Sequence, residues 1–234
     1  MNKKANTSEF QSTDLSFAAD NNIYKIVWVF FICCIVGHMA EMVFAFIKNG
    51  EWVNRQGLIY GPFNQIYGLG AVLFTLTLYR LRNANAVIIF AASAVVGAAF
   101  EWLCSFAQEL AFGSVSWEYS NTPFNLGGRT NLFFAVCWGI MGLIFIRNFY
   151  PFLSDIIEKI PNAIGKPLTI VIAIFMVFDM GISAVAVARQ NGRTNGMPAA
   201  NFIETFLDSH YTDEYLAKVY PSMKFVQTEG TFVK

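Results

Sequence analysis

Long apolar segments dominate the chain, and their length predicts membrane-spanning helices. A helix rises about 1.5 Å per residue, so roughly 20 mostly apolar residues are needed to cross the ~30 Å hydrocarbon core of a bilayer. Five segments approach or exceed this length, at residues 23–47, 63–79, 84–112, 131–150 and 168–188. The sequence therefore predicts an all-α fold, a polytopic membrane helix bundle of about five transmembrane helices within residues 23–188.

The polar segments around these spans have other patterns. Residues 1–22 lack a helical period, which predicts a disordered cytoplasmic leader. Residues 151–167 contain apolar positions at helical spacing, typical of a short amphipathic helix on the inner membrane surface. Residues 189–193 form a loop signal, and residues 202–219 predict one amphipathic helix. Residues 189–234 are therefore expected to be a partly helical, extracytoplasmic C-terminal tail.

Composition supports the membrane assignment. Hydrophobic residues make up 55% of the chain and charged residues 14%, against about 25% charged residues in soluble domains. Sixteen basic and sixteen acidic residues cancel. Membrane lipids are therefore the expected surroundings, and the chain has no basic surplus that would favour nucleic acid.

Basic residues are distributed unevenly between the two predicted sides of the membrane. Eight lie on the side of the N-terminus: Lys3, Lys4, Lys25, Arg80, Arg82, Arg147, Lys159 and Lys166. The short loops on the other side carry Lys48, Arg55 and Arg129, while five further basic residues in the tail count against the bias. Because basic loops stay inside, the distribution favours a multi-pass protein of the cell membrane with a cytoplasmic N-terminus.

Three acidic residues lie inside predicted spans and need an explanation. Glu41, Glu101 and Asp179 each place a carboxylate in apolar sequence, where a charge costs at least ~2.5 kcal/mol. Arg55 and Arg129 are the natural partners, since an arginine can bind a carboxylate with two parallel hydrogen bonds. Two interpretations stay open: structural Glu–Arg clamps that hold the outer loops, and a polar site that binds substrate or carries a proton. For Asp179, a hydrogen bond to a neighbouring helix is the alternative.

The two outer loops are rich in glycine, asparagine and aromatic residues. Residues 55–70 contain four glycines and a proline, which predict a re-entrant turn leading into a broken second span. Its free N–H groups could hold an anion, and close glycine packing is the alternative. The candidate substrate-binding or proton-carrying residues are Glu41, Arg55, Tyr60, Asn64, Tyr67, Glu101, Trp117, Tyr119, Asn125, Arg129 and Asp179.

A weak internal echo links the two halves. Glu41 precedes the Asn of a Pro-Phe-Asn motif at residues 62–64 by 23 residues, and Glu101 precedes that of residues 123–125 by 24. Tandem duplication of two-span units is one explanation, as in many transporters, and chance similarity is the other.

Metal and thiol chemistry have little support. All four cysteines lie in predicted spans, and no Cys-x-x-Cys or His/Cys cluster is present. His38 stands three residues before Glu41, but one such pair is too few for a di-iron bundle. We expect neither a metal nor a cofactor.

Several motifs resemble those of a known family. They are Gly37-x-x-x-Glu41, Arg55-Gln56-Gly57-x-x-Tyr60-Gly61-Pro62, Ile66-Tyr67-Gly68, Glu101-Trp102, Trp117-Glu118-Tyr119-Ser120, Pro123-Phe124-Asn125-Leu126-Gly127 and Trp138-Gly139. In order and spacing they resemble the bacterial CmpB-like family of ABC-transporter type IV permeases, over about residues 27–151. The chain departs from the family pattern at His38, at Asn64-Gln65 and at Glu118. The fifth span and the tail lie outside this resemblance.

The resemblance implies a permease subunit. Its ATPase would be a separate polypeptide, since the chain contains no G-x-x-x-x-G-K-[ST] motif. Three function hypotheses follow. The first is a permease subunit or small-molecule transporter with a polar site in the outer half of the bundle. The second is a membrane-embedded enzyme acting on a lipid or lipid-linked substrate, which the lack of a nucleophile motif or metal cluster counts against. The third is a membrane sensor or assembly factor.

Overall fold

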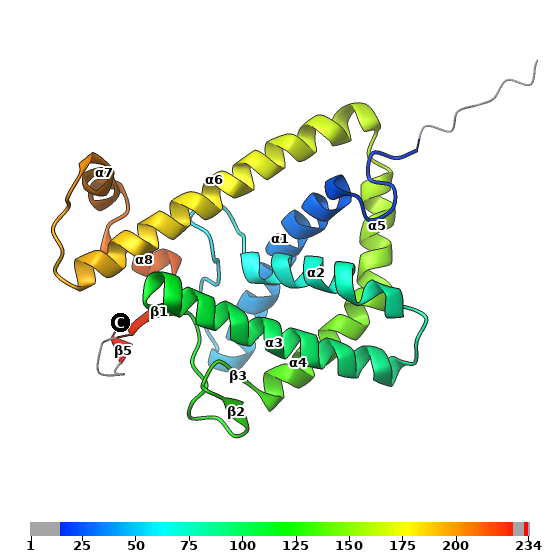
Figure 1. The fold of residues 1–234 in the computed structure, drawn as a ribbon, viewed down its shortest axis with the longest axis horizontal. Coiled ribbons are helices and arrows are strands. Elements are labelled where there is room, and N and C mark those ends of the chain that lie inside the picture. The colour runs from blue at the N-terminus through cyan, green and yellow to red at the C-terminus, as the bar shows by residue number, and fades with distance from the viewer. Residues whose placement is uncertain (1–14, 227–231, 234) are drawn as a thin grey trace, which may run out of the picture.

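The computed structural model describes residues 15–226, 232 and 233, and helices dominate it (Figure 1). Within this range, four helical segments are long and apolar enough to cross a membrane: α1 (Ile23–Asn49), α3 (Ala86–Phe112), the continuous segment Leu132–Glu158 and α6 (Asn162–Thr194). The predicted all-α membrane bundle is confirmed.

The second predicted span is a short helix. α2 (Gln65–Thr77) has 13 residues, a length of about 20 Å. It follows irregular backbone that folds into the bundle, where Leu58 is 2% exposed and the N–H of Asn64 donates to the Cys34 carbonyl of α1 at 2.9 Å. Irregular backbone at membrane depth must be buried by protein or line a cavity, and this segment meets that requirement. A 3₁₀ turn (η1, Tyr79–Leu81) then leads towards α3.

Two long helices each pair with a short one. α1 and α3 have 27 residues each, and their short partners α2 and α4 (Leu132–Ile144) have 13 each. In both pairs a glycine four residues before the glutamate of the long helix, Glu41 or Glu101, allows close approach. A Cβ on Gly37 would lie 2.2 Å from the Tyr67 side chain, and one on Gly97 would lie 2.5 Å from that of Trp138. The halves therefore share an architecture.

The Pro-Phe-Asn motifs are not equivalent in these two halves. Asn64 is the N-cap of α2, and its side chain accepts from the N–H of Ile66 at 3.2 Å. Asn125 instead lies in a hairpin of β2 (Asn125–Leu126) and β3 (Thr130–Asn131), and Asn131 caps α4. The likeness therefore rests on the paired helices rather than on these motifs.

The segment predicted as a surface helix continues a span instead. A π-helical turn (η2, Phe145–Phe149) joins α4 to α5 (Tyr150–Glu158). Leu153 and Ile157 of α5 are buried in a core with Val29 of α1, and Lys25 forms an ion pair with Glu158. Leu153 and Ile157 thus face protein, while Phe152 and Ile156 are exposed. The contact with α1 explains why this segment extends the bundle.

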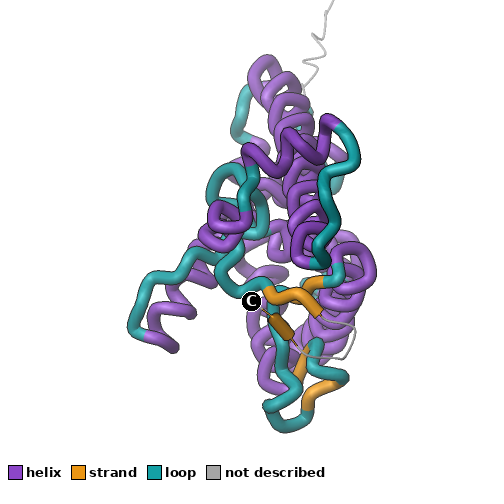
Figure 2. The backbone as a smooth tube through the Cα atoms, turned by 90° about the vertical axis from the view of Figure 1, so that its left-hand side faces the viewer, coloured by secondary structure: helices purple, strands orange, loops and turns teal. Residues whose placement is uncertain are grey.

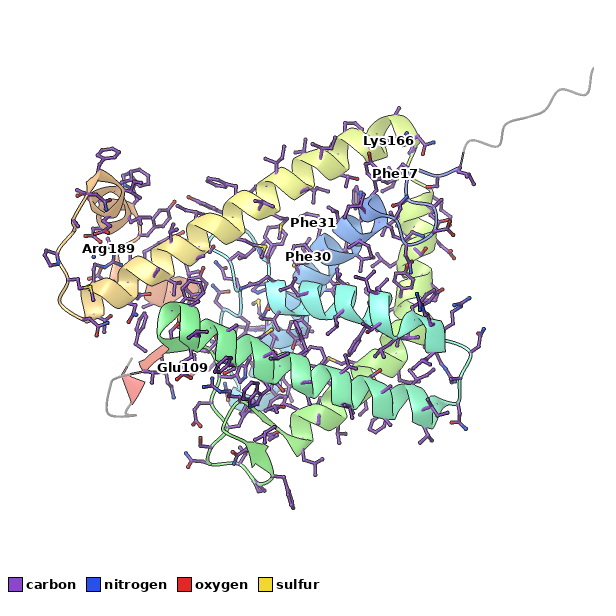
Figure 3. The ribbon with its side chains drawn as sticks, in the orientation of Figure 1. Phe17, Phe30, Phe31, Glu109, Lys166 and Arg189 are labelled. Atoms are coloured by element: carbon purple, nitrogen blue, oxygen red, sulfur yellow. The ribbon has the colours of Figure 1, made fainter. Side chains whose placement is uncertain are left out.

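Part of the predicted disordered leader is packed against the bundle. Phe17 is 4% exposed, and its N–H donates to the Asn162 side chain of α6 at 2.6 Å. Figure 3 shows Phe17 at the same end of the molecule as Lys166. The expectation of disorder does not hold for residues 15–22, while residues 1–14 lie outside the described residues.

The tail differs from its sequence pattern in two ways. α6 continues to Thr194, through the stretch predicted as a loop. The single amphipathic helix expected afterwards is divided into α7 (Phe202–His210) and α8 (Asp213–Val219), because the Thr212 side chain caps a new helix by accepting from the N–H of Tyr215.

Ion pairs explain why α6 extends so far. Arg189 binds Asp208 at 2.8 Å, and Arg193 binds both Asp208 and Asp213 at 2.6 Å. Figure 3 shows Arg189 at the end of α6, close to α7. These contacts hold the last turns of α6 in helical form against the tail.

Short strands return the tail to α3. β1 (Ser114–Val115) follows α3 directly and pairs antiparallel with β4 (Lys224–Val226), which also pairs with β5 (Phe232–Val233). Figure 2 shows the strands gathered at one end of the molecule. The tail therefore lies over the end of the bundle where α1 and α3 finish.

Candidate functional site

A cavity of about 680 Å³ opens at this end of the bundle, and we call it the outer cavity. Seven predicted candidates line it: Glu41, Arg55, Asn64, Tyr67, Glu101, Trp117 and Tyr119. Tyr60, Asn125, Arg129 and Asp179 are not in its lining.

α1, α2 and α3 contribute to the cavity from the same half of the bundle. Lys48 lies in the last turn of α1, Gln65 is the first residue of α2, and Phe112 is the last residue of α3. The cavity therefore lies at the end of the bundle that the distribution of basic residues assigns to the extracytoplasmic side.

Glu41 connects the two helices of the first pair. Its carboxylate on α1 accepts a hydrogen bond of 2.5 Å from the hydroxyl of Tyr67 on α2. The missing side chain at Gly37 allows the Tyr67 ring to lie directly against α1, one turn before Glu41. The sequence places the acid, and the glycine allows its partner to approach.

Glu101 is held by the second outer loop. It is 6% exposed on α3 and accepts hydrogen bonds from the Thr130 hydroxyl at 2.7 Å and the Tyr119 hydroxyl at 3.2 Å. Both donors come from the segment between α3 and α4. The loop thus folds back over the acid of its own half.

Tyr119 shows how closely the charged groups gather. Burial raises the pKa of its phenol well above the ordinary value, the carboxylates of Glu101 and Glu41 raise this pKa further, and the Arg55 guanidinium lowers it. Such electrostatic effects weaken with distance, so all three charged groups lie near one ring. The phenol stays protonated at neutral pH and can donate to Glu101.

Arg129 does not form the expected pair with Glu101. It binds Glu109 at 2.5 Å and the Ser105 hydroxyl at 3.2 Å, and its guanidinium lies over the Phe106 ring. Figure 3 labels Glu109 near the end of α3. Glu109 lies two turns beyond Glu101 on α3, closer to the loop that carries Arg129, so it forms the ion pair in place of Glu101.

Arg55 also has an unexpected partner. Its guanidinium donates to the hydroxyl of Ser222 in the tail, and its Nε is buried without a hydrogen-bond partner. Among the described residues, neither Glu41 nor Glu101 forms an ion pair. The predicted Glu–Arg clamps are therefore replaced by hydroxyl–carboxylate contacts.

Asp179 is hydrogen-bonded to the re-entrant loop, whereas the alternative considered for it was a bond to a neighbouring helix. It is 0% exposed on α6, and its Oδ1 accepts from the backbone N–H of Tyr60 at 3.1 Å. Its Oδ2 has no hydrogen-bond partner. The Tyr60 hydroxyl lies 2.7 Å from that of Tyr211 in the tail. Asp179 and Tyr60 together connect the re-entrant loop to α6 and the tail.

Asn125 shapes the second outer loop. Its side chain donates to the Thr122 carbonyl at 2.8 Å and accepts from the N–H of Gly128 at 3.0 Å.

The re-entrant turn was considered as an anion site because its N–H groups could be free. One of these groups, the N–H of Ile66 at the start of α2, already donates to the Asn64 side chain.

Sequence reasoning missed the contribution of the tail. Tyr220, Pro221, Ser222 and Met223 line the cavity, as do Cys104 and Gln108 of α3. No motif marks the tail residues, because their place depends on the pairing of β4 with β1. No group of three metal-ligating side chains occurs in the part of the chain that the structure describes.

The fold and this cavity define a multi-pass helical membrane protein with a polar cavity at one end. A family model described as putative ABC-transporter type IV (CmpB) matches residues 28–184, and the chain belongs to this family. The match includes most of α6, so residues 168–184 of the fifth predicted span lie inside it, contrary to expectation, while the tail lies outside. No curated protein and no solved structure is significantly similar to the chain.

Proposed function

We propose that this protein is the permease subunit of an ABC-type transporter, or a small-molecule transporter of similar construction, whose substrate occupies the outer cavity. One observation carries the proposal: two carboxylates from the two helix pairs, Glu41 and Glu101, line one cavity together with Arg55. Intramembrane ionisable residues that face a cavity are typical of substrate and ion pathways.

The likeness of the two helix pairs suggests how the cavity changes access. Many transporters hold their substrate between structural repeats and move one repeat against the other. Here the α1–α2 pair would rock against the α3–α4 pair, with Glu41 and Glu101 on opposite sides of the substrate. A separate ATPase subunit would supply the energy, and the N-terminus would be cytoplasmic.

Native Cys104 offers a direct test, because it lines the cavity whereas Cys137 does not. The test variant keeps Cys104 as its single cysteine. A membrane-impermeant thiol reagent is added to right-side-out and inside-out vesicles, with and without ATP. A transporter exposes Cys104 to the outer face in one state and to the inner face when it cycles, so ATP should change the labelling from the inner face. A variant that keeps only Cys137 is the control.

A membrane-embedded enzyme is the second candidate, and one observation favours it. The lining residues come from a single half of the bundle, as a one-sided pocket for a lipid substrate requires. Labelling of Cys104 from the outer face only, unchanged by ATP or a proton gradient, would contradict the transporter and support this enzyme.

A further inference from the structure

The charges of the outer cavity are separated by depth. Glu41 stands eight residues before the end of α1, and Glu101 eleven before the end of α3, so they lie about 12 and 16 Å inside the helix ends at ~1.5 Å per residue. The two basic lining residues are Lys48, in the last turn of α1, and Arg55, in the following loop. The lining therefore combines two acids deep in the helices with two basic residues beyond them along the chain, and Glu118 is its third acidic residue.

The deep acids lack a positive partner. Glu41 meets the Tyr67 hydroxyl, and Glu101 meets two further hydroxyls. Neutral donors leave the carboxylate charge uncompensated, and a buried charge is costly unless it is paired. A cationic group between the two acids would supply that pair.

Aromatic rings form the walls around this position. Tyr67 stacks with Trp138 at a centroid distance of 6.3 Å, and Tyr119 stacks with Phe134 at 4.7 Å. All four residues line the cavity. Aromatic faces beside carboxylates are the environment in which proteins bind ammonium groups, because the negative ring face attracts the cation.

Arg55 provides the complementary end. Its Nε is buried without a hydrogen-bond acceptor, although its Nη1 donates to the hydroxyl of Ser222. A buried guanidinium N–H without an acceptor is destabilising, and a carboxylate or phosphate oxygen is its best partner.

We infer that the outer cavity binds a zwitterion, with an ammonium group held between Glu41 and Glu101 and a carboxylate or phosphate group held by Arg55. This inference rests on the proposed function in taking the cavity as the substrate site. Two sources supply the chemistry: a free zwitterion and the headgroup of a zwitterionic phospholipid. The cavity volume of about 680 Å³ lies within the range of small-molecule sites, ~300–1,000 Å³.

The test measures binding to the full-length protein in detergent by calorimetry. The probes are phosphoethanolamine, which carries both charges, and ethylamine and ethyl phosphate, which carry one each. Phosphoethanolamine should bind at least tenfold more tightly than either single-charge probe. Glu101→Gln and Arg55→Gln should each weaken it tenfold or more. The matched control is Glu109→Gln, which changes the same charge on α3 outside the lining and should leave the affinity unchanged.

A second arm identifies the source. The melting temperature is compared in nanodiscs of phosphatidylethanolamine and of phosphatidylglycerol. A rise with the zwitterionic lipid that Glu101→Gln and Arg55→Gln both remove, without phosphoethanolamine binding in detergent, identifies a lipid headgroup as the ligand. Phosphoethanolamine binding in detergent, with no difference in melting temperature between the two nanodisc lipids, identifies a free zwitterion.

Two results would overturn the inference. One is equal affinity for ethylamine and phosphoethanolamine with no effect of Arg55→Gln, which would define a simple cation site. The other is no response in either arm while the variants remain folded by circular dichroism. Neither result bears on whether ATP changes Cys104 labelling, so the inference and the proposed function fail separately.

Discussion

At the residue scale, the charge that the outer cavity offers to a ligand depends on how Glu41 and Glu101 are hydrogen-bonded. Glu101 accepts from two hydroxyls and Glu41 from one, and neither has a cation beside it in the described structure. Hydroxyl donors fix the position of a carboxylate without neutralising it. The charge therefore stays available to a ligand, which a Glu–Arg clamp would have prevented.

Substitution of Glu101 should separate binding from folding. Thr130 and Tyr119 donate to different oxygens of Glu101. Glu101→Gln keeps an oxygen acceptor for one hydroxyl, and its amide N–H can donate to the other hydroxyl oxygen, so its melting temperature in detergent should stay close to wild type while transport or ligand binding is lost. Glu101→Ala leaves both hydroxyls unpaired and should reduce the free energy of unfolding by about 1–3 kcal/mol. Function equal to wild type in Glu101→Gln would remove this carboxylate from the site.

Arg129 should behave in the opposite way. Arg129→Gln removes the ion pair with Glu109 and the contact with the Phe106 ring, both outside the cavity. We expect the free energy of unfolding to fall by roughly 1 kcal/mol or less, which is typical of a partly exposed pair, and the melting temperature to fall with it. Ligand affinity in the folded fraction should be unchanged. A tenfold loss of affinity at unchanged stability would place Arg129 in the site after all.

The acids could be predicted from the sequence, but their partners could not. A carboxylate within an apolar run is visible in the sequence, as Glu41, Glu101 and Asp179 were. Which donor reaches it depends on how the loops fold. Glu109 competes for Arg129, and Asp179 is used by the backbone of Tyr60. Seven of the eleven candidates line one cavity because the outer loops of both halves close over the same end.

At the scale of elements, long-range contacts override local signals in the tail. Asn191 and Gly192 follow Arg189 and predict a loop, yet α6 continues because Asp208 and Asp213 bind its last arginines. In α5, Leu153 and Ile157, two of the apolar positions that suit a membrane surface, pack against protein instead. Apolar periodicity predicts that a helix forms, but it does not say what covers the apolar face.

The ion pairs at Asp208 predict that the tail responds to pH. Hydrogen bonds from Arg189, and then from Arg193, lower the pKa of Asp208 from 3.8 to about 2. Because the folded pKa lies below the unfolded one, the stabilisation is complete above the unfolded value and is lost as pH falls from about 4 to about 2. Hydrogen exchange of α7, corrected for the intrinsic rate, should therefore accelerate over this interval.

The matching variant is Asp208→Asn, which should already show fast exchange of α7 at pH 7 and little change down to pH 2. Asp155→Asn on α5 changes the same charge away from the tail and should behave as wild type. Slow exchange of α7 in Asp208→Asn at pH 7 would mean that other contacts hold the tail.

At the scale of the whole molecule, the tail forms a wall of the outer cavity although it lies beyond the family match. Its connections to the rest of the protein include the ion pairs to α6, the hydrogen bond from Arg55 to Ser222, the Tyr60–Tyr211 hydroxyl contact and the pairing of β4 with β1. Access to the cavity should therefore depend on a segment that the family's shared region does not include.

Weakening the strand pairing should open the cavity. Val226→Pro removes the N–H that donates to the Gly113 carbonyl at 2.8 Å, without changing a lining residue. We expect the thiol reagent to modify Cys104 at least several-fold faster, with little change in the melting temperature of the bundle. Phe202→Pro tests the start of α7, which makes no strand contact, and should have a smaller effect. An unchanged rate at Cys104 in Val226→Pro would show that the tail does not limit entry.

The likeness of the two helix pairs has a consequence for how the acids can differ. A polypeptide with one long and one short helix would enclose such a hollow only as a homodimer, and symmetry would make both acids identical. Joining two pairs in one polypeptide removes that constraint. Glu41 and Glu101 already differ in their donors, one hydroxyl against two. One ligand group can thus be met by two unequal acids, which gives it a single preferred orientation.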